Sequence, residues 1–233
     1  MNKKNILMII AAILILAATA AGYAGYKKGW FKSEPPQTIS DYKTLLTFDI
    51  KKQGLDDEMI QVYQEKFNEV KGRLEQDPES LNDWLYLGIL KKSVEDFEGA
   101  RQAWVYAGQV RPQNSSSFAN LADLYAYFLN QPEKAEAAIK TAIANDPNDA
   151  NLYQAMADIY RYKFPGREAL YETTMLDAIA KFPADPNLVS QLAAYYKQTK
   201  QNQKAIEYYE KLIQLSPDNE QAKDDLARLK EQE

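Results

Sequence analysis

Residues 81–114 read LNDWLYLGILKKSVEDFEGARQAWVYAGQVRPQN. In the first half, Leu87 and Gly88 follow Trp84 by three and four residues, which places all three on one face of a helix. In the second half, Ala100 and Trp104 are four residues apart in the same way. A Gly or Ala on one helix lets the backbone of another approach, and a neighbouring Trp fills the remaining space. The segment therefore predicts a pair of closely packed helices.

The same arrangement returns along the chain with a period close to 34 residues. Five prolines mark the period: Pro78, Pro112, Pro147, Pro183 and Pro217. The bulky residues equivalent to Trp84 are Phe118, Tyr153 and Val189, and the small residues equivalent to Gly88 are Ala122, Ala157 and Ala193. A further position holds Tyr125, Tyr160 and Tyr196, with Lys91 as the exception. Helix pairs that cannot bury a face alone stack on their neighbours, so the period predicts a helical repeat domain.

This pattern resembles the tetratricopeptide repeat, in which Trp-x2-Leu-Gly-x2-Tyr is followed by Ala, Phe, Ala and Pro, and residues 81–114 match it best. The resemblance implies an all-α fold, namely a right-handed α-α superhelix, or solenoid. The expected repeat domain covers residues 53–233. It comprises a partial repeat at 53–80, repeats at 81–114, 115–149, 150–185 and 186–219, and a capping helix at 220–233.

Two repeats depart from the regular length. The repeat at 115–149 gains a residue near 130–132, and the repeat at 150–185 gains two near 164–167, so we expect altered loops there. In the latter repeat, either Ala169 or Tyr171 can take the close-contact position of the second helix, with Thr173 expected four residues after Ala169. Residues 40–48 carry a weak helix signal.

The composition excludes most enzyme chemistry. The chain has no Cys and no His, which removes thiol nucleophiles, thiolate metal sites and the commonest general base. We therefore expect no catalytic residues, no cofactor and no metal site. Residues 1–32 carry five Lys and no acidic residue, which leaves 23 basic and 33 acidic residues in the rest. A body with this negative balance repels phosphate backbones, so nucleic acid is not an expected partner.

The first residues indicate a membrane anchor. Residues 1–5 form a short basic end, and residues 6–26 are predicted to be a single transmembrane helix or uncleaved signal anchor, because the uncharged run reaches about 30 Å as a helix. Tyr23, Tyr26 and Trp30 lie near its end, as interfacial aromatic residues do. The alternative is a signal peptide cleaved after residues 18–20, which would release a secreted soluble protein. Residues 27–52 are predicted to be a linker.

The balance of charge around this segment sets its expected orientation. A four-residue basic head usually stays in the cytoplasm, although three Lys also follow the apolar run. We therefore expect a single-pass protein of the cell membrane, with a cytoplasmic N-terminus and an extracytoplasmic repeat domain.

The resemblance also implies a concave groove for peptides, lined by one flank of the first helix of each repeat. The alternatives are a solvated flank or a seat for the chain's own linker. The candidate groove residues are Asn82, Leu85, Ile89, Lys92, Ser116, Ala119, Asp123, Tyr127, Asn151, Gln154, Asp158, Arg161, Tyr162, Asn187, Ser190 and Lys197. The groove is expected to be apolar at its N-terminal end and polar beyond. A clamp for the carboxylates of a peptide C-terminus is not expected, because Leu85 and Ile89 occupy two of its positions.

The expected function is binding: a membrane-anchored, non-catalytic scaffold that holds a protein or peptide partner in this groove. One rival is a structural subunit of an envelope assembly or homo-oligomer that uses its convex face. A second rival is an enzyme that uses carboxylates alone. The identity of the partner and the oligomeric state are not encoded in any recognisable motif.

Overall fold

The structure is a computed structural model that describes residues 41–231. The predicted basic end at 1–5, the predicted transmembrane helix at 6–26 and residues 27–40 of the predicted linker lie outside the described residues. Within 41–231, no helix combines the length and the apolar character needed to cross a membrane.

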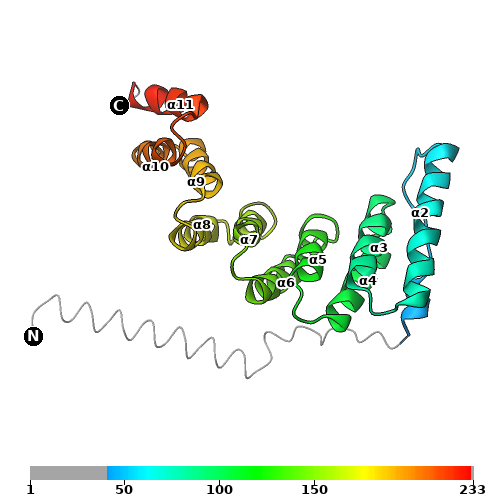
Figure 1. Ribbon diagram of the computed structural model, residues 1–233. Coiled ribbons are helices and arrows are strands. Elements are labelled where there is room, and N and C mark those ends of the chain that lie inside the picture. The colour runs from blue at the N-terminus through cyan, green and yellow to red at the C-terminus, as the bar shows by residue number, and fades with distance from the viewer. Residues whose placement is uncertain (1–40, 232–233) are drawn as a thin grey trace, which may run out of the picture. The chain divides into compact units, whose positions relative to one another are not determined.

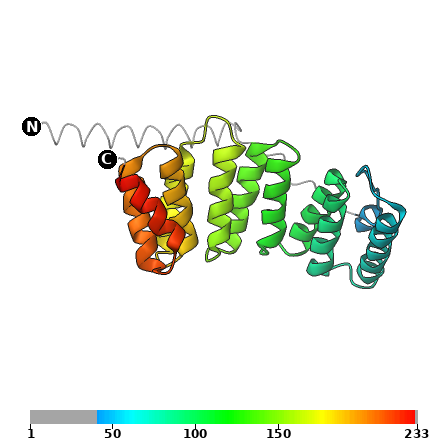
Figure 2. The ribbon, with the colours of Figure 1, turned by 90° about the horizontal axis from the view of Figure 1, so that it is seen from above.

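The described residues form an all-α helical repeat, and consecutive helices pack on each other in chain order (Figures 1 and 2). A short 3-10 helix, η1 (Tyr42–Leu45), precedes α2 (Asp57–Gln76). Four helix pairs follow: α3 (Leu81–Ser93) with α4 (Phe97–Val110), α5 (Ser116–Tyr127) with α6 (Pro132–Asn145), α7 (Ala150–Tyr162) with α8 (Leu170–Lys181), and α9 (Pro186–Gln198) with α10 (Asn202–Leu215). The unit ends with α11 (Glu220–Lys230).

The helix starts follow from capping residues in the turns. The side chains of Asp56, Asp96 and Asn219 each accept a hydrogen bond from a backbone N–H of the first turn of the helix that follows. Such caps satisfy N–H groups that have no partner inside the helix. Pro132 and Pro186 occupy the first helical position of α6 and α9, where a missing N–H costs nothing.

The small and bulky residues pack as the period predicts. Trp84 is fully buried, and its indole N–H donates to the carbonyl of Pro78 at 2.8 Å. Trp104 is also buried, and its indole N–H donates to the carbonyl of Leu85 at 3.1 Å. A Cβ atom on Gly88 would lie only 2.2 Å from the Trp104 Nε1 atom, so a glycine is required at this crossing. The α3–α4 pair is therefore held by an interlocking contact and not by apolar area alone.

The core is divided into three clusters that succeed each other along the chain. The first joins η1, α2, α3 and α4, the second joins the α3–α4 pair with α5, α6 and α7, and the third runs from α7 to α11. Each cluster spans at least one boundary between repeats. Stacking between neighbouring repeats thus buries the faces that a single pair leaves open.

Lys91 occupies the position at which the other repeats have a tyrosine. Its side chain is buried, and its ammonium group lies 3.6 Å from the carboxylate of Asp96. Burial lowers the pKa of Lys91, while the neighbouring Asp96 opposes that shift. Asp96 also caps α4 through Gly99 and accepts a hydrogen bond from Lys51 at 2.7 Å. One carboxylate thus serves a helix cap, a buried cation and the preceding segment.

The structure resolves the register of the third repeat. Tyr171 is 1% exposed, whereas Ala169 is exposed before α8, so Tyr171 takes the close-contact position. Met175, four residues later, is buried, and Thr173 faces solvent. The interpretation through Ala169 and Thr173 is therefore wrong. The longer connection at 163–169 is the cause, because it delays the start of α8.

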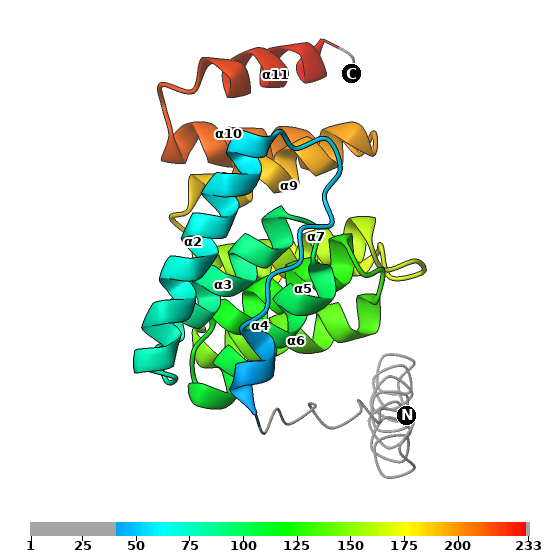
Figure 3. The ribbon, with the colours of Figure 1, turned by 90° about the vertical axis from the view of Figure 1, so that its right-hand side faces the viewer.

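Residues 41–52 belong to the helical unit, although the sequence places them in the linker. Leu45 and Leu46 are buried in the first core cluster, and the ring of Phe48 stacks on Phe67 of α2 with centroids 4.8 Å apart. The backbone N–H groups of residues 51 and 52 both donate to the carbonyl of Val94. Figure 3 shows this segment running beside α2. It covers a side of α2 and α3 that would otherwise be apolar and open.

Candidate functional site

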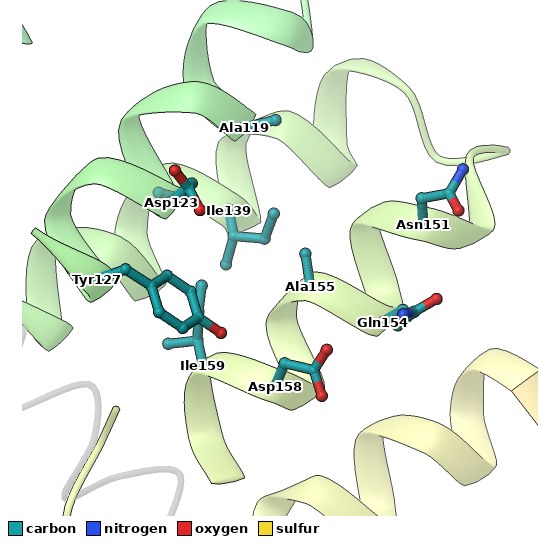
Figure 4. Close-up of a pocket in the computed structure, with 10 residues that line it drawn as sticks. Ala119, Asp123, Tyr127, Ile139, Asn151, Gln154, Ala155, Asp158 and Ile159 are labelled. Atoms are coloured by element: carbon teal, nitrogen blue, oxygen red, sulfur yellow. The ribbon is translucent and has the colours of Figure 1, made fainter. Parts of the chain in front are cut away.

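A pocket of about 270 Å³ lies between α5 and α7, the first helices of two successive repeats. Figure 4 shows the side chains that line it. They are Ala119, Ala122, Asp123, Tyr127, Ile139, Asn151, Gln154, Ala155, Asp158 and Ile159. Six of the predicted groove residues meet here: Ala119, Asp123, Tyr127, Asn151, Gln154 and Asp158. The pocket is smaller than the roughly 300–1,000 Å³ of typical small-molecule sites, so its size suits a side chain and not a cofactor.

The pocket has an apolar floor and a polar rim. Ile139 of α6 and Ile159 of α7 are almost fully buried and form the floor. Asp123 and Tyr127 come from α5, while Asp158 comes from α7 and lies opposite them (Figure 4). This combination can bind an aliphatic chain that ends in a polar group, because each part of such a chain meets matching surface.

Asp123 already has a partner in the preceding repeat. The ammonium group of Lys92, on α3, forms an ion pair and a short hydrogen bond with its carboxylate. Lys92 also lies over the ring of Phe128, 4.4 Å from the centroid. The Asp123 side chain nevertheless stays 45% exposed, so one of its faces remains open to the pocket. Lys92 therefore fixes this carboxylate in place without covering it.

Asp158 differs because it has no such neighbour. Among residues 41–231, no basic side chain forms an ion pair with it. Burial raises the pKa of Asp158, and the charge of Arg161 opposes the shift only in part. Burial also raises the pKa of Tyr127, and the negative charges of Asp158 and Asp123 act in the same direction. Of the two pocket carboxylates, Asp158 is thus the one without an ion-pair partner among residues 41–231.

Arg161 is directed away from the pocket. Its guanidinium group lies 4.8 Å from the ring centroid of Tyr171 and 4.9 Å from those of Tyr162 and Tyr195, and it donates a short hydrogen bond to Gln198. These contacts tie α7 to α8 and α9 through cation–π attraction. Tyr162 remains 59% exposed beside it. The structure therefore gives Arg161 a position between repeats and leaves Tyr162 accessible.

The other candidates lie at separate places along the repeat. Lys197 pairs with Asp225 of α11 at 2.6 Å, so its charge is directed to the C-terminal helix. Leu85 is half-buried between two core clusters, whereas Ile89 is 51% exposed. Asn82, Ser116 and Asn187 are exposed, and Ser190 is half-buried. None of these side chains lines the α5–α7 pocket.

Sequence reasoning missed four lining residues: Ala122, Ile139, Ala155 and Ile159. The first two were recognised only as repeat core positions. These two residues line the pocket from beneath and stay almost fully buried in the second core cluster. The helical period assigns a residue to a face, but the width of the gap between two such faces depends on the stacking.

Within the described part of the chain, no group of three or more acidic residues is placed to hold a metal ion. The two pocket carboxylates belong to different helices, Asp123 to α5 and Asp158 to α7. The arrangement can bind a polar or charged group.

Comparison with known proteins agrees with the geometry. The tetratricopeptide repeat family matches residues 115–149 and again residues 186–219. The α3–α4 and α7–α8 pairs, outside these two matches, have the same helix-pair arrangement. Proteins of the tetratricopeptide repeat family typically bind protein or peptide partners and are typically non-catalytic.

Solved structures show the same fold at low identity. The crystal structure of MamA has a TM-score of 0.56 with 14% identity, and the match covers 72% of this chain and 99% of that one. PilW, described as a widely conserved type IV pilus biogenesis factor, has a TM-score of 0.52 with 19% identity, over 68% of this chain and 72% of that one.

A curated relative is anaphase-promoting complex subunit 7 of Arabidopsis thaliana. It is 24% identical over 141 residues, which are 60% of this chain. The chain spans about a quarter of the length of this relative, since the match covers 24% of it.

Proposed function

We propose that this protein is a membrane-anchored scaffold that holds an extended peptide segment of a partner protein across α5 and α7. The observation that carries the proposal is the α5–α7 pocket, whose polar rim and apolar floor come from two successive repeats. Proteins with this kind of repeat typically bind partners and do not catalyse reactions, which supports a binding function. The curated relative is, by its name, a subunit of a multiprotein complex, which is a role of the same kind.

The anchor is the second part of the proposal. The uncharged run at 6–26 supports insertion in a membrane, and the basic residues before it favour a cytoplasmic N-terminus with the repeats outside. An anchor of this kind raises the local concentration of the scaffold near partners that share the membrane. Cleavage near residues 18–20 would instead give a secreted protein with the same groove.

Site-specific photo-crosslinking in cells tests the groove. A photoreactive amino acid replaces Ala155 in the pocket, and the matched control replaces Ala137, an exposed alanine on α6 outside the pocket. The proposal expects a discrete partner adduct at position 155, and mass spectrometry of the adduct should map a linear segment of the partner. Adducts at position 137 alone would favour the structural rival that uses the outer helices.

That rival rests on a specific observation. Leu170 and Leu176 on α8 are 38% and 36% exposed, and Met59, Ile60 and Val62 on α2 are about as exposed. Apolar side chains on outer surfaces are candidates for contacts between subunits. Light scattering of the purified full-length chain distinguishes the two views, because a homo-oligomer that disperses after Leu176→Glu supports the rival.

The absence of cysteine makes the topology easy to measure. An Ala137→Cys variant carries a single thiol, on an exposed face of α6. A membrane-impermeant maleimide should label it in intact cells from which any outer barrier has been removed. Labelling only after the membrane is opened would contradict the extracytoplasmic placement, and an intact mass that lacks the first 20 or so residues would contradict the anchor.

A further inference from the structure

We propose that the α5–α7 pocket takes a lysine or arginine side chain of the partner peptide, with Asp158 as the principal acceptor. This inference rests on the proposed function and adds the chemical class of the anchoring residue. It follows from the shape of the pocket, from the charges that face it and from the positions of the amides at its rim.

The first argument is shape. A basic side chain consists of an aliphatic stem and a charged end, and such side chains bury the stem along apolar surface. The pocket offers Ile139 and Ile159 as the floor, with Asp158 and the Tyr127 hydroxyl at one end. The volume of about 270 Å³ admits one long side chain with a few waters, because a water occupies about 30 Å³.

The second argument is charge. Two carboxylates face the pocket, and Lys92 compensates only Asp123. Of the nearby cations, Arg161 stacks on Tyr171 and Tyr195, and Lys163 lies over the ring of Tyr127, 4.7 Å from its centroid. Neither forms an ion pair with Asp158 among residues 41–231. The ionised form of a carboxylate is stabilised when an opposite charge lies within hydrogen-bonding distance. A cationic group of the ligand would therefore form the ion pair that Asp158 does not have among the described residues, whereas an acidic side chain of the ligand would be repelled.

The third argument concerns the rest of the peptide. Asn151 and Gln154 lie at the rim on the same helix as Asp158, and amide groups can pair with a peptide backbone as donor and acceptor. A free polyamine would use the carboxylates but not these amides. The geometry therefore favours a basic residue within an extended peptide over a small diffusible cation.

The test starts from display selection on the purified full-length chain. The probe is a library of random decapeptides, and each selected peptide is synthesised with its basic residue intact and with that residue changed to norleucine. The result expected is one recurrent Lys or Arg in the selected sequences. Replacing that residue by norleucine should weaken binding at least ~10-fold, as measured by fluorescence anisotropy.

The variant Asp158→Asn identifies the acceptor, and Asp177→Asn, on an exposed position of α8, is the matched control. Asn keeps the shape of the carboxylate, and an unchanged urea midpoint checks that the fold survives. In Asp158→Asn the ratio of affinities between the basic and the norleucine peptide should fall towards one, while Asp177→Asn should preserve it. The loss of this ratio separates an acceptor from a residue that merely supports the pocket.

The outcomes separate the two proposals. Peptides that bind and shift pocket resonances in NMR without any basic residue would overturn this inference and leave the scaffold function standing. A lysine preference that survives Asp158→Asn would also overturn it. Failure to select any peptide would contradict both. Binding that appears only after Lys27, Lys28 and Lys32 are replaced by Gln would assign the pocket to the chain's own basic segment and overturn a partner peptide as occupant.

Discussion

The phenolic oxygen of Tyr196, on α9, lies 2.9 Å from a carboxylate oxygen of Glu172, on α8. The same contact occurs one repeat earlier, where the Tyr160 hydroxyl donates to Glu136 at 2.8 Å. The two partners are separated by 24 residues in both cases. These tyrosines are nearly buried and occupy the recurrent position of the first helix. Each one therefore joins its repeat to the second helix of the preceding repeat.

Removing the Tyr196 hydroxyl should loosen this connection. Tyr196→Phe keeps the buried ring but removes the hydrogen bond to a charged acceptor, which should cost about 1 kcal/mol in the free energy of unfolding. Urea unfolding followed by circular dichroism measures the change. Tyr162→Phe is the control, because that side chain is 59% exposed and should change the free energy of unfolding little. Equal effects from the two substitutions would contradict the connection.

A methyl group on Gly88 should disrupt the α3–α4 crossing. Gly88→Ala places Cβ 2.2 Å from Trp104 Nε1, so the indole must move and its hydrogen bond to Leu85 is strained. Overpacking of this kind costs about 1–3 kcal/mol. Gly72→Ala is the matched control, since nothing lies within 4 Å of its new Cβ and Ala favours a helix over Gly. Thermal unfolding should show Gly88→Ala destabilised and Gly72→Ala unchanged or stabilised.

Asp96 should be worth more than an ordinary helix cap. Asp96→Ala removes the cap of α4 and leaves buried Lys91 without its carboxylate, a change expected to cost about 3 kcal/mol. Asp56→Ala removes the cap of α2 alone and should cost about 1 kcal/mol. Chemical denaturation of both variants checks the difference. Similar values for the two caps would show that Lys91 tolerates the loss.

Among residues 41–231, the non-glycine residues in the left-handed region of the backbone are Glu95, Asn130 and Lys200, with φ of 65°, 50° and 57°. Non-glycine residues pay roughly 1–2 kcal/mol for this conformation. Lys200→Gly should therefore raise the melting temperature by a few degrees, because Lys200 is exposed and its backbone keeps the same φ. Lys211→Gly, within α10, should lower the stability by about 1 kcal/mol. A lower melting temperature for Lys200→Gly would contradict this reading of the turn.

The domain should lose stability in acid through its paired carboxylates. The hydrogen bond from Lys204 lowers the pKa of Glu172, and Tyr196 acts in the same direction. Burial alone would raise the pKa of Glu136, but Lys140 and Tyr160 outweigh it and the net shift is downward. A carboxylate whose pKa is lower in the folded state than the unfolded value of 4.5 stabilises the fold at pH values above 4.5. This stabilisation is lost as the pH falls through the pKa of the folded state.

The measurement is the free energy of unfolding between neutral pH and about pH 3, taken for the wild type and for Glu172→Gln. The variant should be less stable at neutral pH and should change less on acidification. Glu133→Gln, an exposed position on α6, should follow the wild type. Asp158 contributes to the pH dependence of the free energy of unfolding with the opposite sign, because burial raises its pKa. Its ionised form therefore destabilises the fold at neutral pH, and protonation in acid removes this effect. An acid profile of Glu172→Gln parallel to that of the wild type would contradict the assignment.

The sequence predicts the repeat because local rules and the period agree. The prolines, the small residues and the recurrent tyrosines indicate where helices start and which faces are buried. These rules do not fix the register of the third repeat, because the connection at 163–169 shifts the start of α8. Tyr171, and not Ala169, is therefore buried at the close-contact position. The same rules do not predict that residues 41–52 are part of the helical unit, because the burial of their side chains depends on a surface that only the folded helices α2–α4 create.

The pocket could be predicted only in part. The helical period places Asp123, Tyr127, Gln154 and Asp158 on one flank, and the structure brings them together. The period cannot say whether a charged group on that flank is already paired. Lys197 meets Asp225 only because α11 packs on α10 and thereby brings Asp225 within reach of α9. Pairings of this kind depend on the angle between repeats, which no residue spacing determines.

The division of the core into three successive clusters has a consequence for how this domain changes length. Nearly all apolar contacts join segments that are close neighbours in the chain, so no single interior has to be rebuilt when a helix pair is inserted or deleted. Such an event disturbs only the two seams at which the new unit meets the old ones. Variants that lengthen or shorten the array by a whole unit are therefore accessible in one genetic step, whereas a globular domain of equal size would lose its interior.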